Sequence, residues 1–347
     1  SKNMISFACD YLEGAHEDVL RALCETNSEQ SAGYGFDAHC KNAADRIRER
    51  CGAPNAAVHF FVGGTQVNMT AIAAVLRPHE GAVCADSGHI NTHESGAVEA
   101  SGHKVIALPS ENGKITAAQV GEYCRAWEED DTREHIVRPR LVYLSHPTEC
   151  GTLYSKSELA AMQKTCREHG LLLYIDGARL AYGLGAAGND VTLRDLAECA
   201  DAFTLGGTKC GALFGEALVL LNEEWNRDFF PIQKQLGAVL AKGRLLGVQF
   251  EALLHDDLYE KIGREADARA YRLRDALLKR GIPMLFDSPT NQQFPILTRE
   301  QAARLSENFG FSAWQNVDEN RRAVRFCTSW ATTDERLESL IRAIENL

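Results

Sequence analysis

Lys209 is the residue whose surroundings most clearly suggest chemistry. It lies in Thr204-Leu205-Gly206-Gly207-Thr208-Lys209-Cys210-Gly211, where glycines and small residues enclose it after a short apolar run. A lysine on a solvated surface normally has polar neighbours. Enclosure lowers the pKa of a lysine and makes its amine a nucleophile for a carbonyl carbon. The alternative is a lysine that binds a phosphate group as a point charge.

A carboxylate and a guanidinium follow another apolar run. Asp176-Gly177-Ala178-Arg179 comes directly after residues 171–175, which are Leu-Leu-Leu-Tyr-Ile. An aspartate at the end of a buried strand can pair with a cationic nitrogen, and an arginine can hold a carboxylate by two parallel hydrogen bonds. The alternative is an aspartate that caps a helix beside a surface arginine.

Gly63-Gly64-Thr65-Gln66 follows a third apolar run and precedes a helical pattern. Small residues at a helix start let the backbone approach a phosphate, and the free N–H groups and the helix dipole attract it. The spacing matches neither the P-loop nor the G-x-G-x-x-G fingerprint, which disfavours a nucleotide. An ordinary helix start is the alternative.

His89-Ile90-Asn91-Thr92-His93-Glu94 places two histidines four residues apart next to an acid. The H-E-x-x-H order of zinc enzymes is absent and the sequence offers no obvious third ligand, so we predict no metal site. A ring that stacks on a flat cofactor, or a general base, suits His89 better. A histidine that only packs in its loop is the alternative.

The elements expected around these groups are βα units. Residues 55–225 alternate short apolar runs with amphipathic stretches, which is typical of an α/β fold with a mostly parallel sheet. Helices are predicted at 65–76 and 158–169, and strands at 56–61, 83–84, 105–107, 140–144, 171–175, 202–205 and 217–221. Ligands of such sheets bind outside the carboxyl ends of the strands, where all four groups fall.

The pattern changes beyond residue 245. Charged helices are predicted at 259–280, 298–308 and 334–346, with strands at 294–297 and 323–327. We therefore expect a large domain over 15–245 and a smaller α+β domain over 246–347. Residues 1–14 are expected to pack near the active site or on the small domain.

Composition limits the possible partners and compartments. The chain has 347 residues, 45% hydrophobic and 24% charged, with a formal net charge of −11, which argues against disorder and against nucleic acid as the main partner. No apolar run reaches the length of a membrane span, and residues 1–4 lack the pattern of a signal peptide. The 11 cysteines form no C-x-x-C pair, which favours reduced thiols and a cytoplasmic protein.

The four groups together predict one ligand. It carries a phosphate, a ring nitrogen that needs an anionic partner, a flat face and an aldehyde for a lysine. Pyridoxal phosphate has all four features.

The sequence resembles the threonine aldolase and β-eliminating lyase family of fold-type I pyridoxal-phosphate enzymes. The resemblance runs from Asp10 to the segment of Arg325. Its anchors are Gly33-Tyr34-Gly35-Phe36-Asp37, Gly64-Thr65-Gln66-Val67-Asn68, His89 with Glu94, Asp176-Gly177-Ala178-Arg179, and Thr208-Lys209. It implies a mostly parallel seven-stranded sheet flanked by helices, with a smaller C-terminal domain.

The resemblance also implies roles for single residues. Lys209 is implied to bind the cofactor through an imine, Asp176 to pair with the pyridine nitrogen, and His89 to stack on the ring. Cofactor contacts are further implied for Gly63, Gly64, Thr65, Arg179, Thr208 and, from a neighbouring subunit, Lys242. Tyr34, Arg179 and Arg325 are implied to bind substrate, with Tyr34 reaching across a dimer interface.

The activity implied is cleavage of L-threonine or L-allo-threonine to glycine and an aldehyde. The base is expected to be His89, His93 or a water molecule. A β-eliminating lyase or an aminotransferase on the same scaffold is the alternative, because fold and cofactor do not fix the reaction. The resemblance implies a homodimer or homotetramer. Departures from the family pattern are Gly63, Cys210 and the segment His146-Pro147-Thr148-Glu149-Cys150-Gly151.

Overall fold

A seven-stranded sheet forms the centre of the molecule. The computed structural model describes residues 4–347. The strand order is β2-β8-β7-β6-β5-β3-β4, and β8 alone runs antiparallel to its neighbours β2 and β7. The strands are β2 (Ala57–Phe61), β3 (Glu80–Ala85), β4 (Lys104–Leu108), β5 (Arg138–Ser145), β6 (Leu172–Asp176), β7 (Ala202–Gly206) and β8 (Glu216–Leu220). The prediction of a mostly parallel seven-stranded sheet is confirmed.

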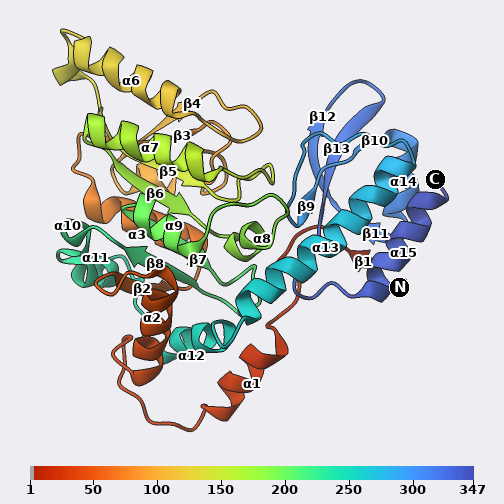
Figure 1. Cartoon of the computed structure of the whole chain (residues 1–347), viewed down its shortest axis with the longest axis horizontal. Coiled ribbons are helices and arrows are strands. Elements are labelled where there is room, and N and C mark those ends of the chain that lie inside the picture. The colour runs from red at the N-terminus through yellow and green to blue at the C-terminus, as the bar shows by residue number, and fades with distance from the viewer. Residues whose placement is uncertain (1–3) are drawn as a thin grey trace.

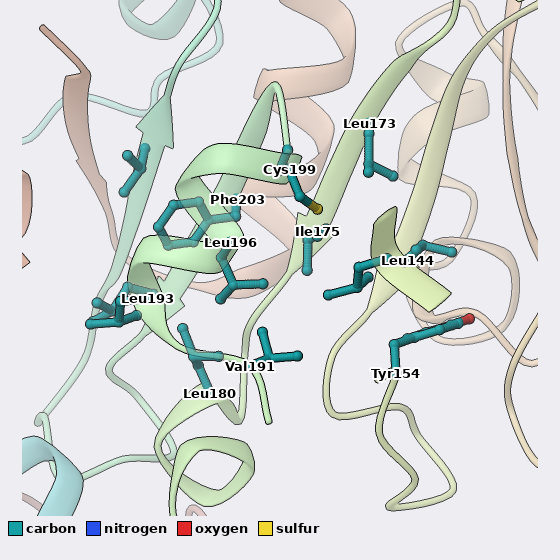
Figure 2. Packing of buried hydrophobic residues seen from close by; sticks show 14 of the residues in the cluster. Leu144, Tyr154, Leu173, Ile175, Leu180, Val191, Leu193, Leu196, Cys199 and Phe203 are labelled. Atoms are coloured by element: carbon teal, nitrogen blue, oxygen red, sulfur yellow. The ribbon is translucent and has the colours of Figure 1, made fainter. Parts of the chain in front are cut away.

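Helices cover both faces of this sheet, which explains why its inner strands are apolar on both sides. On one face, Figure 2 shows Ile175 of β6, Phe203 of β7 and Leu196 of α9 in one buried layer. The helices of this face are α1 (Glu17–Glu25), α2 (Ala38–Cys51), α6 (Ala117–Glu129), α7 (Lys156–His169), α9 (Leu193–Cys199) and α12 (Arg244–Leu253). The other face packs under α3 (Gly64–Val75), α4 (His89–Thr92), α5 (Ala97–Ala100), α10 (Glu223–Asn226) and α11 (Phe229–Gln235).

A smaller antiparallel sheet lies at the C-terminal end of the molecule, at the right of Figure 1. Its order is β10-β13-β12, and β9 pairs with β13. Its own apolar core lies under α14, α15 and the second half of α13 (Leu258–Lys279). The elements are β9 (Gln292–Gln293), β10 (Ile296–Thr298), α14 (Arg299–Ser306), β12 (Ser312–Asn316), β13 (Arg321–Cys327) and α15 (Asp334–Glu345).

The helix α13 (Leu258–Lys279) belongs to both cores and connects the two parts (Figure 1). Tyr259 and Ile262 pack in the first core, whereas Leu273 and Leu277 pack in the small one. Phe250 of α12 also lies in the first core. The boundary at residue 245 stays a prediction, and we propose that the division falls later, within α13.

The N-terminal segment crosses to the small sheet. β1 (Ile5–Ser6) pairs in parallel with β11 (Phe309–Gly310), and the N–H of Cys327 donates to the carbonyl of Phe7. The chain then continues past Asp10 towards α1. Residues 1–14 were expected to pack near the active site or on the small domain. That expectation includes residues 1–3, which lie outside the described residues. No helix within residues 4–347 has the length and apolar character needed to cross a bilayer.

Candidate active site

The carboxyl ends of β5, β6 and β7 open into one cleft. Polar groups reach it from α3, from α4 and from the ends of these three strands and the loops that follow them. The cleft is lined by Gly64, Asn68, His89, Ser145, Pro147, Glu149, Asp176, Ala178, Arg179 and Lys209. The structure therefore brings together at least one member of each of the four groups singled out in the sequence.

Asp176 ends β6 and is held by donors on both carboxylate oxygens. Its Oδ2 accepts from the hydroxyl of Tyr143 (2.5 Å) and the amide of Asn68 (3.0 Å). Its Oδ1 accepts from the backbone N–H of Ala178 (3.0 Å). Because these donors come from α3, β5 and the loop after β6, the carboxylate has one fixed position in the cleft.

Lys209 lies in the turn between β7 and β8. The backbone N–H of Gly215 donates to Oγ1 of Thr208 (3.0 Å), and the hydroxyl of Tyr182 donates to the carbonyl of Lys209 (2.5 Å), so this turn is tied down on both sides. Burial and the charge of Arg179 lower the pKa of Lys209. The lysine therefore has more free amine near neutral pH than an exposed lysine would have.

Glu216, at the start of β8, is a second buried acid near this lysine. Its Oε2 accepts from the N–H of Gly207 (3.2 Å). Burial raises the pKa of Glu216 to about 7, although the charge of Lys209 opposes that rise. Nothing in the sequence pattern separated this residue from an ordinary strand end.

Gly63 and Gly64 leave open space at the N-terminus of α3. A Cβ atom added at either glycine would meet no atom within 4 Å, and Gly63 gives the helix no side-chain cap. The first N–H groups of a helix have no partner inside it. An anion can therefore approach this backbone, and the exposed Thr65 adds a hydroxyl beside it.

His89 is oriented by a buried hydrogen-bond chain. Its Nδ1 pairs with Oε1 of Glu94 (2.7 Å), which also accepts from Asn68 (2.8 Å). Burial raises the pKa of Glu94, while its hydrogen bonds to His89 and Asn68 oppose the shift. The chain links the His89 ring to Asp176 through a single amide, since Asn68 donates to both acids.

Arg179 forms a buried bidentate ion pair with Asp10. Its Nε and Nη2 donate to the two carboxylate oxygens at 2.7 and 3.1 Å, and Asn291 donates to Oδ2 as well (3.0 Å). Burial opposes ionisation of Asp10, but the charges of Arg179 and Lys209 outweigh it and lower the pKa of Asp10 to about 2. In the sequence Asp10 only marked the start of the family resemblance, and its pairing was not predicted because Arg179 lies 169 residues away.

Arg325 and His93, two of the predicted site residues, are not among the residues that line the cleft. Arg325, on β13, donates to Oε1 of Gln292 and to the carbonyl of Ala8, both at 3.1 Å, and its Nε has no partner within residues 4–347. Burial lowers the pKa of His93, and the charges of His89 and then of Arg325 lower it further. Its ring stacks on His89 with centroids 5.8 Å apart.

Tyr34 and Lys242 lie together but outside this cleft. The N–H of Tyr34 donates to the carbonyl of Ala241 (3.1 Å), and both Tyr34 and Lys242 are exposed. A single chain therefore does not bring them to Lys209. Their contribution from a second subunit stays a prediction.

Other polar residues that line the cleft or contact its lining residues had no role in the sequence analysis. Asn68 and Glu94 were part of larger motifs, and Glu149 belonged to a departure from the family pattern. Tyr143 lies within the predicted apolar strand 140–144, where nothing distinguished it from its neighbours. The signal that finds these polar groups is burial beside a charged partner, and burial is visible only in the structure.

The donor set fits pyridoxal phosphate. Open backbone at Gly63 and Gly64 suits the phosphate, and Asp176 offers an anion for the ring nitrogen. The amine of Lys209 suits the aldehyde, and the ring of His89 offers a flat face.

Comparison with known proteins gives the family. The family model described as beta-eliminating lyase matches residues 7–308. The chain belongs to this family. The low specificity L-threonine aldolase of Pseudomonas aeruginosa is 30% identical over 341 residues, which cover 97% of this chain and 96% of that protein. That of Saccharomyces cerevisiae is 26% identical, covering 83% and 72%.

Solved structures agree with this family membership. The threonine aldolase of Leishmania major has a TM-score of 0.96 and 41% identity, with 99% of each chain covered. An aspartate aminotransferase of Thermus thermophilus has a TM-score of 0.72 at 16% identity, covering 99% of this chain and 92% of that one, so it shows the fold alone. Enzymes of the beta-eliminating lyase family depend on pyridoxal phosphate.

Proposed function

We propose that this member of the beta-eliminating lyase family cleaves a β-hydroxy-α-amino acid, L-threonine or L-allo-threonine, to glycine and an aldehyde. The observation that carries the proposal is the cleft in which Lys209, Asp176 and Arg179 face one another. The names of the relatives that match over nearly the whole chain support the same reaction.

Pyridoxal phosphate is the cofactor that we propose for this cleft. Gly63, Gly64, Thr65 and Thr208 would hold its phosphate, Asp176 its ring nitrogen, His89 its ring face and Lys209 its aldehyde carbon. When bound, this cofactor supplies an aldehyde that captures amines and a ring that stores an electron pair.

The chain's own residues would orient the substrate. Asp10 occupies one edge of the Arg179 guanidinium, which leaves further N–H donors of Arg179 for a substrate carboxylate. Arg325 of β13 would be the second cation for this carboxylate. A fixed carboxylate restricts rotation about Cα, and such positioning lowers the barrier of the bond cleavage.

We also propose a homo-oligomer that works in a reducing compartment, the cytoplasm. The exposure of Tyr34 and Lys242, away from the cleft of their own chain, supports a second subunit. The free state of all 11 cysteines supports reducing conditions.

A product assay tests the reaction. We expect the purified enzyme with added pyridoxal phosphate to release glycine and acetaldehyde in equal amounts from L-threonine or L-allo-threonine. Lys209→Ala should abolish turnover and the visible absorbance of the covalently held cofactor. Ammonia with a keto acid as the main products would instead identify a β-eliminating lyase, and amino-group transfer to an added keto acid would identify an aminotransferase.

A further inference from the structure

The loop after β5 places a glutamate in the cleft whose chemistry is still unassigned. We propose that Glu149 is the general base that removes the β-hydroxyl proton of the substrate. This inference rests on the proposed function, since it concerns the proton that must leave when the Cα–Cβ bond breaks.

The two carboxylate oxygens of Glu149 have different surroundings. Oε1 accepts from the backbone N–H of His89 (3.0 Å) and from the hydroxyl of Ser145 (2.5 Å). Oε2 accepts no hydrogen bond within residues 4–347, and this oxygen is not fully buried. Because Glu149 lines the cleft together with Asp176 and Lys209, we infer that this second oxygen is the one available to a substrate there.

The other acids and histidines near the cleft are less suited to take this proton. Donors hold both oxygens of Asp176. Nδ1 of His89 is engaged by Glu94, and its ring is the flat surface available to the cofactor. His93 does not line the cleft, and its Nδ1 pairs with the hydroxyl of Thr92 (2.6 Å). Of the two acids that line the cleft, Asp176 and Glu149, only Glu149 has an oxygen, Oε2, that accepts no hydrogen bond within residues 4–347.

The electrostatic environment strengthens this carboxylate as a base. Burial raises the pKa of Glu149, and the negative charge of Asp176 adds to the rise, although the hydrogen bond from Ser145 opposes it. A carboxylate whose pKa lies closer to neutral accepts a proton more readily than an exposed one.

The step balances without an additional reactant. Oε2 takes the hydroxyl proton, the O–H electrons form the aldehyde C=O bond, and the Cα–Cβ electron pair stays with the glycine fragment, which pyridoxal phosphate would stabilise when bound. Cα then takes a proton and glycine leaves. Glu149 releases its proton to solvent before the next cycle, and solvent supplies the proton that Cα takes up, so no net proton is gained or lost.

Glu149→Gln is the direct test. Glutamine keeps the size of the side chain and an oxygen that accepts from His89 and Ser145, but it cannot take a proton. We expect kcat for threonine cleavage to fall by about 10²- to 10⁴-fold. Exchange of the α-hydrogens of glycine in D₂O, followed by NMR, needs no β-hydroxyl base and should stay within about threefold of wild type. Cofactor content and the urea unfolding midpoint should not change.

Two further variants complete the experiment. Glu129→Gln, at an exposed position at the end of α6, controls for the substitution itself and should behave as wild type. Glu149→Asp keeps a carboxylate and should recover part of the lost kcat. In wild type, kcat/KM should fall as the pH is lowered, because Glu149 takes up a proton. This fall should begin at a pH above the ordinary glutamate pKa, and it should be absent in Glu149→Gln.

The outcomes separate this inference from the proposed function. If wild type releases no glycine from either threonine isomer, the proposed function is wrong. If wild type is active and Glu149→Gln cleaves threonine at a similar rate, proton transfer belongs to another group and this inference is overturned. Loss of glycine exchange together with cleavage would overturn it too, because Glu149 would then act in binding.

Discussion

At the scale of single residues, the site depends on an ion pair that is buried on both sides. Asp10 is fully buried and Arg179 nearly so, with side-chain exposures of 0% and 11%. Removing one partner of such a pair leaves the other as an uncompensated buried charge. The pair therefore fixes Arg179 in one orientation, and Asn291 fixes Asp10 from the small-domain side.

Asp10→Ala and Asp10→Asn should differ in stability but share a kinetic defect. We expect Asp10→Ala to lose about 3–5 kcal/mol in the free energy of unfolding, measured with urea, and Asp10→Asn to lose less because it still accepts hydrogen bonds. Both should raise KM for threonine by about tenfold or more, since Arg179 loses its charged anchor. Wild-type KM in Asp10→Asn would show that Arg179 does not need Asp10 for orientation.

The same pair predicts how stability changes with pH. The pKa of Asp10 is about 2 in the folded chain and 3.8 by its ordinary value, so its stabilising effect is present above pH 4 and is lost as pH falls towards 2. The difference in unfolding free energy between wild type and Asp10→Asn should shrink over that window by about 2 kcal/mol, because one pKa unit corresponds to about 1.4 kcal/mol. Urea titrations at a series of pH values would measure it. If the difference in unfolding free energy stays constant between pH 4 and pH 2, the lowered pKa of Asp10 is wrong.

At the scale of elements, the sequence predicted what local patterns encode. β5, β6 and β7 are almost continuous apolar runs, so the positions of these strands and of the turns after them were predicted to within a few residues. Asp176 and Lys209 were predicted as site residues because they follow two of these strands. The two-residue pairing of β1 with β11 has no periodic pattern, and the partners of Asp10 and Glu149 lie on other elements. Those contacts depend on tertiary packing, which local patterns do not record.

Glycines let the elements around the site approach one another closely. A Cβ at Gly263 of α13 would lie 1.8 Å from the carbonyl oxygen of Ala181, in α8 (Leu180–Leu184) directly after Arg179. A Cβ at Gly206 would lie 2.3 Å from the carbonyl oxygen of Ala178. The loop that carries Asp176 and Arg179 is therefore held between two backbone contacts that only glycine permits.

Gly263→Ala should disturb both stability and the site. We expect a loss of about 1–3 kcal/mol in unfolding free energy and a lower kcat/KM, because the shift of α8 displaces Arg179. Gly121→Ala, also inside a helix, is the matched control: its Cβ would meet only the movable Arg125 guanidinium at 3.1 Å and Thr165 at 3.6 Å. It should be neutral or stabilising by up to about 1 kcal/mol. Equal effects of the two changes on urea midpoints and kinetics would rule out the close packing as the cause.

At the scale of the whole molecule, one chain leaves part of the expected site unused. Tyr34 is 46% exposed and Phe36 is 72% exposed, on a segment that runs beside Ala241. Lys234 lies over the Tyr34 ring at 4.6 Å, so aromatic and basic groups share one surface. Such a surface suits a second copy of the chain whose cleft it would complete.

Mixing two inactive variants tests whether subunits share their sites. Lys209→Ala lacks the amine, and Tyr34→Ala should lose most activity if Tyr34 enters the neighbouring cleft. After equal amounts are unfolded together and refolded, half of the dimers are mixed, and one of the two clefts in each mixed dimer pairs an intact Lys209 with an intact Tyr34. Activity should therefore return to about a quarter of the wild-type level, with a dimer or larger assembly seen by light scattering. Full activity of Tyr34→Ala alone, or no recovery on mixing, would place Tyr34 outside the neighbouring site. Complementation requires an intact Lys209 from one chain and an intact Tyr34 from the other.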